Sequence, residues 1–199
     1  MIKFENYFAS FKQYFKEENI KTWDFIKNIE QITAYKVIQL DSDYFLKDGV
    51  AIHRTAKIEN NVNIKAPAII GKECFIGANT YLRNGVFLTE KVCIGTGCEI
   101  KSSIIFRNSS ISHFNFIGDS LIGENVNFEA GSITANHYNE RENKEIVVKF
   151  ENILERTGLI KFGSIVGDFC KIGANAVLSP GTILSKNTTV KRLELVEQV

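Results

Sequence analysis

Apolar residues recur at every sixth position through the middle of the chain. Stepping by six finds only isoleucine or leucine, at Ile52, Ile58, Ile64, Ile70, Ile76, Leu82, Leu88, Ile94 and Ile100. A helix repeats every 3.6 residues and a strand every 2, so neither period alone singles out each sixth residue. The pattern predicts short strands separated by turns.

The residues beside these anchors define the repeating unit. The residue two positions earlier is small or β-branched, and glycine follows the anchor at Gly71, Gly77 and Gly95. Each unit therefore places two side chains inward and then turns, where glycine tolerates unusual backbone angles. Three such units make one triangular coil, and coils bury their faces only by stacking. The predicted fold class is all-β, a parallel β-helix.

The repeat has two interruptions. It slips by about one residue near Ile105, then resumes at Ile111, Ile117, Ile122 and Phe128. Residues 135–163 break it, and their polar, charged composition predicts a long loop ejected from one corner. The repeat returns between Val166 and Val190, so the predicted β-helix covers residues 47–191 and leaves 192–199 as a tail.

The N-terminal segment 1–46 follows a different pattern. Phe4, Phe8, Phe11 and Phe15 have helical spacing, and so do Phe25, Ile29 and Ile32. We expect two short helices that form a cap on the first coil, because an open β-helix end exposes an unpaired strand edge. Core packing explains these aromatic residues better than a cofactor site does.

Composition narrows the possible partners. Lys and Arg total 24 and Asp and Glu 23, which argues against a general nucleic-acid binder. No apolar run approaches the roughly 20 residues that span a bilayer, and the N-terminal residues do not resemble a signal peptide. We therefore expect a cytoplasmic protein with no membrane partner.

Cysteine and histidine give little sign of metal binding. Cys74, Cys98 and Cys170 each stand two positions before an anchor, which predicts small apolar core residues. The spacing of His53 and His137 resembles no known ligand set, so no metal site is predicted.

A column of cations follows from the three-unit coil. Lys65, Arg83 and Lys101 are each separated by three units, so they should stack on one corner, where like charges are unfavourable. Either a bound anion such as phosphate stabilises them, or their side chains spread into solvent. His113 is suited to accept a proton near neutral pH, although taken alone it fits a structural or surface role better.

A family resemblance rests on two longer stretches. The segments KSSIIFRNSSISHFNFIGDSLIGENVNFEAGSITAN and GSIVGDFCKIGANAVLSPGTIL resemble the acetyltransferase domain of the bifunctional sugar-1-phosphate nucleotidylyltransferase/glucosamine-1-phosphate N-acetyltransferases. The likeness covers about residues 50–190 and leaves out the nucleotidylyltransferase half. It implies a left-handed β-helix, acetyl-CoA as the acyl donor, and a homotrimer with sites between subunits.

The resemblance also assigns residues to roles. It implies that His113 is the catalytic base and that Arg83 and Lys101 hold the sugar phosphate. The other residues implied to contact the sugar are Glu99, Phe116, Asn127, Asn136 and Lys144. Ala130, Gly173 and Ala174 are implied to line the acyl-donor pocket. Three departures stand out, because the family usually has tyrosine at Phe116 and at His137 and glycine at Glu129.

Together these features predict an acetyl-CoA-dependent N-acetyltransferase for an amino-sugar phosphate such as glucosamine-1-phosphate. A non-catalytic sugar-phosphate-binding or assembly module is a second interpretation, motivated by Glu129 and the short C-terminal tail. An acetyltransferase for a nucleotide-linked sugar or for a hydroxyl group is a third.

Overall fold

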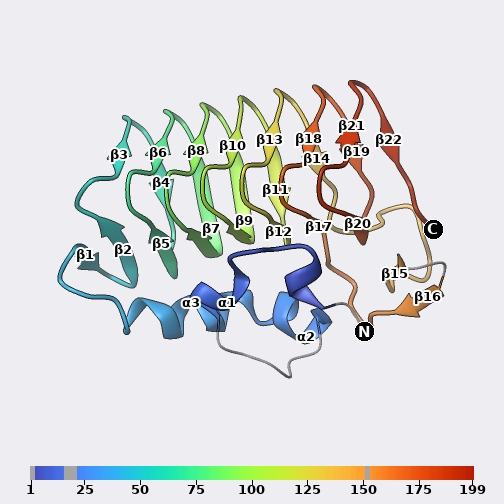
Figure 1. Ribbon diagram of the computed structural model, residues 1–199, viewed down its shortest axis with the longest axis horizontal. Helices are drawn as coiled ribbons and strands as arrows, with labels where there is room; N and C mark the ends of the chain where they lie inside the picture. Colours follow the sequence, from blue (N-terminus) through green and yellow to red (C-terminus); the bar gives the residue numbers. More distant parts are fainter. Residues whose placement is uncertain (1–2, 16–21, 151–152) are drawn as a thin grey trace.

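The six-residue repeat folds into short parallel strands that stack side by side along one axis (Figure 1). The computed structural model describes residues 3–15, 22–150 and 153–199, so the predicted N-terminal segment 1–46 is described in part. Each pass of the chain places one strand on each of three faces, which confirms the predicted β-helix.

The three faces are defined by their strands. Face 1 consists of β3 (Lys57–Ile58), β6 (Phe75–Ile76), β8 (Cys93–Ile94), β10 (Ser110–Ile111), β13 (Asn127–Phe128), β18 (Lys171–Ile172) and β21 (Thr189–Val190). Face 2 consists of β4 (Asn63–Ile64), the beginnings of β7 (Tyr81–Leu88) and β9 (Glu99–Ile105), β11 (Phe116–Gly118), β14 (Ile133–Thr134), β19 (Val177–Leu178) and β22 (Leu195–Val196). Face 3 consists of β2 (Val50–His53), β5 (Ala68–Ile70), the ends of β7 and β9, β12 (Leu121–Ile122), β17 (Ser164–Val166) and β20 (Thr182–Leu184).

The anchors fill the interior of the coil. Ile70, Ile76, Leu82, Leu88 and Ile94 are all fully buried in one core cluster. The predicted small residues join them, and Cys74, Cys98 and Cys170 are buried as expected. Burial raises the pKa of the Cys74 thiol to about 12, so this side chain is an inert core residue.

The register slip lies slightly earlier than the sequence suggested. Arg83 pairs with Lys101, exactly three repeat units further along, whereas Val86 pairs with Ser103, one position short of that offset. The extra residue on β7 falls at the corner that contains Gly85, whose φ is +86°. A Cβ atom at Gly85 would lie 2.5 Å from the Glu30 Cα atom, so the glycine allows close approach of a helix.

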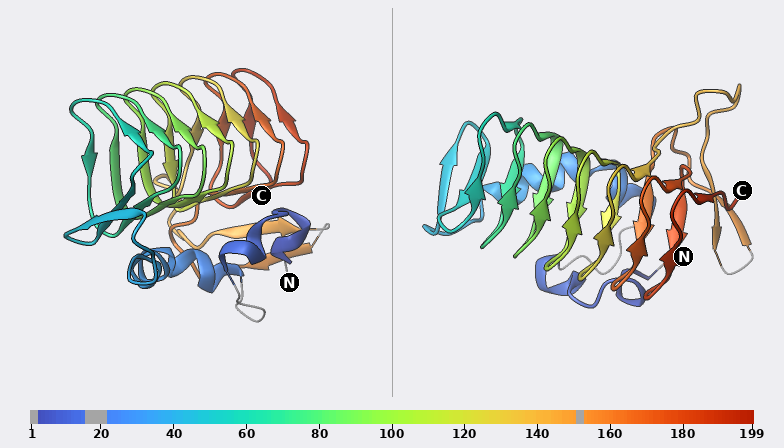
Figure 2. Two further views of the ribbon diagram at one scale, coloured as in Figure 1. Left: turned by 60° about the vertical axis from the view of Figure 1, so that its left-hand side comes forward. Right: turned by 90° about the horizontal axis from the view of Figure 1, so that it is seen from above.

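The N-terminal helices cover a side of the β-helix rather than only its open end. They are η1 (Phe4–Asn6), α1 (Phe11–Tyr14), α2 (Thr22–Lys27) and α3 (Ile29–Val37), and they run along face 3 (Figures 1 and 2). Their aromatic side chains pack on a column of outward apolar residues, namely Ala51, Ile69, Phe87, Ile104, Leu121, Ile165 and Ile183. The edge of the first coil is instead covered by β1 (Tyr44–Lys47), which pairs antiparallel with β2.

The predicted loop 135–163 contains a folded hairpin. The segment leaves the coil at Asn136, whose carbonyl accepts a hydrogen bond from the Phe162 N–H at 2.9 Å. Within it, β15 (Val147–Phe150) and β16 (Ile153–Arg156) pair antiparallel on the same side of the coil as the helices (Figure 2). Ile146, Val148 and Phe162 join the apolar cluster beneath the helices, so the described parts of this segment pack on the molecule despite its polar composition.

One buried carboxylate fastens the N-terminal helices to the coil. Asp168 is fully buried, and its oxygens accept hydrogen bonds from the N–H groups of Ala9 at 2.8 Å and Glu124 at 2.9 Å. Lys186 Nζ lies 3.0 Å from the same carboxylate. Among the described helices, none is long and apolar enough to cross a bilayer.

Candidate active site

His113 lies in the turn that joins β10 on face 1 to β11 on face 2. Its carbonyl accepts hydrogen bonds from the Gly131 N–H at 2.9 Å and from Asn115 Nδ2 at 3.2 Å, which fix the turn. The imidazole is exposed, and a Cβ atom at Gly95 would lie 3.1 Å from its Nδ1 atom. Gly95 therefore leaves room for the ring, and Nδ1 is the ring nitrogen that lies close to it.

Successive coils repeat this corner in one column. Backbone hydrogen bonds from each coil to its neighbour align Ala78, Thr96, His113, Ala130, Ala174 and Arg192. Ala130 and Ala174, both implied to line the acyl-donor pocket, thus follow His113 directly along the stack. The residue after His113, Phe114, has a φ of +57° and an exposed ring, in a position that Gly131 and Asn175 occupy on the following coils.

A second polar cluster lies at the other end of face 2. Lys101 Nζ is 2.8 Å from Asp119 Oδ1, and Asn136 Nδ2 donates to the other carboxylate oxygen. The Lys101 and Asp119 side chains are only 11% and 13% exposed, so the ion pair is largely shielded from water. Sequence reasoning assigned no role to Asp119, which directly follows Gly118, the residue that pairs with Lys101 on the next coil.

Arg83 forms a neighbouring ion pair. Its Nε and Nη2 atoms lie 2.7 Å and 2.6 Å from Glu99 Oε1. The register confirms that Arg83 and Lys101 stack, as their spacing predicts. Arg83 and Lys101 each have a carboxylate partner, however, whereas Lys65 makes no ion pair among the described residues. The argument from like-charge repulsion to a bound phosphate is therefore weakened for Arg83 and Lys101.

Phe116 connects the two clusters across face 2. It pairs in register with Glu99, and a Cβ atom at Gly118 would lie 2.6 Å from its Cζ atom and 3.0 Å from Asn136 Nδ2. The ring therefore lies over Gly118 beside Asn136. The structure thus brings five of the residues implied to contact the sugar into one region: Arg83, Glu99, Lys101, Phe116 and Asn136.

Two other implied sugar residues lie elsewhere in this chain. Asn127 begins β13 on face 1, and Lys144 is exposed in the inserted segment. A cavity of about 290 Å³ adjoins Asp119 instead, and it is lined by Lys27 from α2 and Lys161 from the end of the insertion. Neither lysine stands in the repeat, so the periodicity that located the other cations could not identify them.

A groove runs along face 1 toward the C-terminal coils. It has a volume of about 670 Å³ and contains Asn127 and Gly173, together with the cationic side chains of Lys171, Lys191 and Arg192. We call it the face-1 groove. Its excess of positive charge suits an anionic ligand.

Glu129 lies at the edge of this groove and is fully engaged. Arg192 Nε and Nη2 lie 2.7 Å and 2.8 Å from its two carboxylate oxygens, and the Ala174 N–H donates to Oε2 at 2.9 Å. The Arg192 hydrogen bonds, and then that of Ala174, lower the pKa of Glu129 to about 2. The Glu129 carboxylate therefore takes up the hydrogen bond of the Ala174 N–H, which a ligand in the groove would otherwise receive.

Comparison with known proteins places the chain in a family. Residues 46–146 match the family described as the GMPPB C-terminal domain, and residues 163–191 match the hexapeptide repeat of succinyl-transferase. The chain belongs to the GMPPB C-terminal domain family. This match and the relatives described next confirm the resemblance seen in the sequence.

Curated relatives of this GMPPB C-terminal domain chain are longer proteins. Bifunctional protein GlmU of Methanococcus vannielii is 31% identical over 79% of this chain and 41% of its own length. The bifunctional sugar-1-phosphate nucleotidylyltransferase/acetyltransferase of Sulfurisphaera tokodaii is 32% identical over 91% of this chain and 44% of its own length. The chain thus spans about two fifths of these relatives. A solved hexapeptide transferase family protein from Anaplasma phagocytophilum is 19% identical, with a TM-score of 0.35 over 76% of this chain and 81% of its own.

No metal site accompanies these residues. Among residues 3–15, 22–150 and 153–199 of this GMPPB C-terminal domain chain, no group of three His, Cys, Asp or Glu side chains is placed to hold a metal ion. This part of the structure offers the His113 imidazole, the paired cations of face 2 and the face-1 groove.

Proposed function

We propose that this chain is an acetyl-CoA-dependent N-acetyltransferase that acts on an amino-sugar phosphate such as glucosamine-1-phosphate. The observation that carries the proposal is the exposed His113 imidazole, held over Gly95 and aligned with Ala130 and Ala174. The names of the matched relatives, which include sugar-1-phosphate nucleotidylyltransferase/acetyltransferase, support this chemistry.

His113 acts as the general base. The amino group of the sugar attacks the thioester carbonyl, and His113 Nε2 accepts the proton that the nitrogen loses. A nitrogen–carbon bond forms, the carbon–sulfur bond breaks, and the thiol of the coenzyme leaves with a proton. The exposed position of the ring lets two substrates approach it, and holding both in the correct orientation supplies much of the rate.

The cations of face 2 hold the sugar phosphate. Arg83 and Lys101 are the candidates, and each must exchange its carboxylate partner for the phosphate when the substrate binds. Lys27 and Lys161 line the cavity beside Asp119 and add positive potential to this end of the site.

The face-1 groove fits the acyl donor. Acetyl-CoA carries a diphosphate and a further phosphate, and Lys171, Lys191 and Arg192 supply matching charge. The Ala174 N–H is placed to donate to an amide or thioester carbonyl, but Glu129 occupies it here. Binding of the donor therefore requires Glu129 to turn away from Ala174.

A homotrimer would complete the site. Outward apolar residues on face 2, including Tyr81, Phe116 and Ile133, are partly or fully exposed in the single chain. A neighbouring copy packed here would cover them and could contribute residues such as Asn127 to the site.

A direct test measures acetyl transfer and donor binding together. Thiol release from acetyl-CoA is followed with glucosamine-1-phosphate, free glucosamine and a nucleotide-linked amino sugar as acceptors, alongside calorimetric titration of acetyl-CoA. We expect acceptor-dependent thiol release that is fastest with the sugar phosphate. Absence of release with every acceptor from a folded protein would refute the proposal, and fastest release with the nucleotide-linked sugar would correct the acceptor.

A second candidate function is favoured by Glu129. Its contacts engage the Ala174 N–H and Arg192, two groups that an acyl donor would use, as expected for a non-catalytic module that binds sugar phosphates only. Binding of glucosamine-1-phosphate without binding of acetyl-CoA, both in the natural chain and in Glu129→Gly, would establish that alternative.

A further inference from the structure

The corner between faces 1 and 2 has the same backbone conformation on every described coil. Its central residue has a positive φ throughout, at Asn61, Asn79, Gly97, Phe114, Gly131, Asn175 and Leu193. Glycine and asparagine adopt this left-handed conformation readily, whereas a large apolar side chain is strained in it. Among the described residues other than glycine that have a positive φ, only Phe114, Phe169 and Leu193 are apolar. Phe114 therefore stands where the backbone favours another residue.

The Phe114 side chain leans on the coil that precedes it. A Cβ atom at Gly97 would lie 2.7 Å from two atoms of the Phe114 ring, so a side chain at Gly97 would displace the ring. The following coil has Gly131 at this corner, which has no side chain to cover the ring. The ring is accordingly 69% exposed. The two glycines thus let the ring lie at the corner and leave it accessible.

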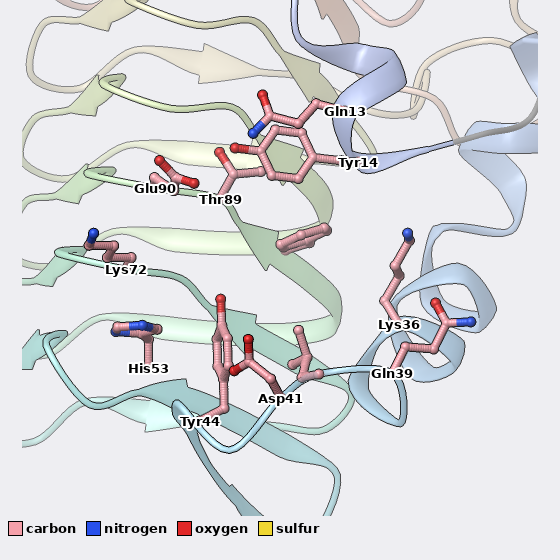
Figure 3. Close-up of a pocket in the computed structure, with 12 residues that line it drawn as sticks. Gln13, Tyr14, Lys36, Gln39, Asp41, Tyr44, His53, Lys72, Thr89 and Glu90 are labelled. Atoms are coloured by element: carbon pink, nitrogen blue, oxygen red, sulfur yellow. The ribbon is translucent and has the colours of Figure 1, made fainter.

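Aromatic side chains on face 3 are shielded in a way that Phe114 is not. Tyr14 and Tyr44 are partly buried and line a cavity of about 400 Å³ between the N-terminal helices and the first coils (Figure 3). Phe87 lines the same cavity and is only 6% exposed. Burial within the single chain explains these rings, but it does not explain an aromatic residue at the corner of Phe114.

The exposed ring adjoins the proposed general base. Its centroid lies 6.5 Å from that of the His113 imidazole, and the two ring planes are inclined by 57°. The two side chains also lie over neighbouring glycines of the preceding coil, His113 over Gly95 and Phe114 over Gly97. A substrate whose reacting atom reaches the imidazole therefore lies beside the Phe114 ring.

The ring lies on the acceptor side of the general base. Gly97 is two residues before Glu99, which pairs in register with Phe116, and both of these are implied to contact the sugar. Ala130 and Ala174, which are implied to line the acyl-donor pocket, lie on the following coils. Because the ring leans on the preceding coil, its direction favours contact with the acceptor over contact with the donor.

We propose that Phe114 is an acceptor-binding residue, whose ring packs against the C–H face of an amino sugar in its pyranose form. The inference rests on the proposed acetyl transfer at His113. An aromatic ring offers a rigid, flat, apolar surface, which suits the C–H groups on one face of a pyranose. The contact adds affinity that does not depend on the phosphate, and it favours an amine carried on a sugar ring over an open-chain amine.

Phe114→Asn tests this role without straining the backbone, because asparagine occupies the same corner on three other coils. We expect the KM for the acceptor that the natural chain acetylates fastest to rise about three- to tenfold, with an equal rise in its dissociation constant by calorimetric titration. The kcat should change little, because the contact is made in the ground state and the transition state alike. The affinity for acetyl-CoA should be unchanged.

The stability of the variant separates a binding role from a structural one. Phe114→Asn should unfold at or above the temperature of the natural chain, because it relieves a strained conformation and removes an exposed ring. Phe114→Tyr retains an aromatic ring and should keep the acceptor KM within about twofold of the natural value. Loss of acceptor affinity in both variants together with a lower unfolding temperature would indicate a structural role instead.

Phe169→Asn is the matched control. Phe169 also has a positive φ, +63°, and is 47% exposed, and asparagine occupies its corner on both neighbouring coils, at Asn125 and Asn187. It lies between β17 and β18, at the corner between faces 3 and 1, rather than beside His113. This variant should leave the acceptor KM unchanged.

The outcomes distinguish this inference from the proposed function. The inference alone is overturned if the natural chain acetylates an amino sugar and Phe114→Asn leaves the acceptor KM and dissociation constant unchanged. It is also overturned if the variant weakens acetyl-CoA binding, or self-association measured by sedimentation, rather than acceptor binding, since the ring would then contact the donor or a neighbouring copy. If the natural chain acetylates no acceptor, the proposed function fails and the inference fails with it.

Discussion

Faces 2 and 3 of the β-helix have the same inward anchors and differ in the residue that precedes each anchor. On face 3 this outward residue is apolar on every coil, from Ala51 to Ile183, and each one is buried by the helices or the inserted hairpin. On face 2 the column runs Asn63, Tyr81, Glu99, Phe116, Ile133, Val177 and Leu195, and every member is partly or fully exposed. The interior repeat therefore sets the fold, whereas the outward column decides which face is covered and which is left for ligands or another chain.

The largest expected effect tests the chemistry at the uncovered corner. His113→Ala should lower kcat for acetyl transfer by about 10²–10⁴, because it removes the general base. The unfolding temperature should change little, since the imidazole is exposed and the turn is fixed by backbone groups. Steady-state assays and thermal unfolding measure the two quantities, and turnover close to that of the natural chain would exclude His113 as the base.

A matched pair of isoleucines tests the difference between the faces. Ile104 is fully buried beneath the helices, so Ile104→Ala should lower the free energy of unfolding by about 2–5 kcal/mol. Ile133 occupies the equivalent outward position on face 2 and is 37% exposed, so Ile133→Ala should cost the single chain much less. Chemical denaturation of both variants gives the comparison.

The dependence on protein concentration shows whether Ile133→Ala loses stability within the single chain or at a contact with a neighbouring copy. A cost that grows with concentration would mean that a neighbouring copy covers face 2, as the proposed trimer requires. A cost equal to that of Ile104→Ala at every concentration would contradict the distinction between covered and uncovered faces.

The sequence predicted the coil well because its signal is strictly local. Anchors repeat by six, and the one-residue slip recurs at the same corner on two successive coils, so Ile94, Ile111 and Phe128 still align. The covered face carried a readable signal too, since Ile69, Phe87 and Ile104 all precede anchors on one face. The inserted hairpin was harder, because Ile146 and Val148 are isolated among charged residues and are buried only by distant parts of the chain.

The attachment of the helices to the coil gives the next prediction. Asp168→Asn replaces a carboxylate that accepts hydrogen bonds from two backbone N–H groups and pairs with Lys186. We expect it to lower the free energy of unfolding by about 1.5–3 kcal/mol. The loss should be concentrated in the N-terminal segment, because the Ala9 N–H donates to this carboxylate. Hydrogen exchange at Ala9 should accelerate more than exchange in the interior strands, and equal acceleration in both regions would indicate general destabilisation instead.

The candidate site was less predictable than the fold. Spacing predicted correctly that Arg83 and Lys101 stack, but their carboxylate partners Glu99 and Asp119 lie on the following coil, and pairing depends on side-chain direction at a corner. The engagement of Glu129 by Arg192 joins residues that are 63 positions apart, across the insertion. Glutamate at a position where the family usually has glycine therefore predicted crowding at the acyl-donor pocket. It did not predict that Arg192 would pair with the carboxylate.

The same corner contact occurs at the opposite end of the stack, where the Ala78 N–H donates to Glu59 Oε2 at 2.8 Å. Glu129 and Glu59 both follow an anchor directly, and both accept an N–H group from the next coil. Only Glu129 also binds an arginine at the edge of a cationic groove. Glu59 therefore offers the control for a purely structural role.

The smallest expected effect is on donor binding. Glu129→Gln removes a negative charge from the face-1 groove and weakens the hold on Arg192, so acetyl-CoA should bind about two- to fivefold more tightly, as expected for an exposed ion pair. Glu59→Gln should leave the affinity unchanged. Calorimetric titration at low and high salt measures both, and the gain should shrink at high salt because exposed charges are screened.

The lowered pKa of Glu129 determines how the gain in acetyl-CoA affinity depends on pH. Glu129 has a pKa of about 2 in the folded chain, below its ordinary value of 4.5, so its ionised contacts stabilise the fold above pH 4.5 and are lost as the pH falls through about 2. Glu129 thus stays ionised between pH 5 and 8, and the ratio of acetyl-CoA affinities between Glu129→Gln and the natural chain should be constant over that range. A ratio that falls toward one as the pH drops from 8 to 5 would show that another group, rather than the Glu129 carboxylate, limits access to the Ala174 N–H.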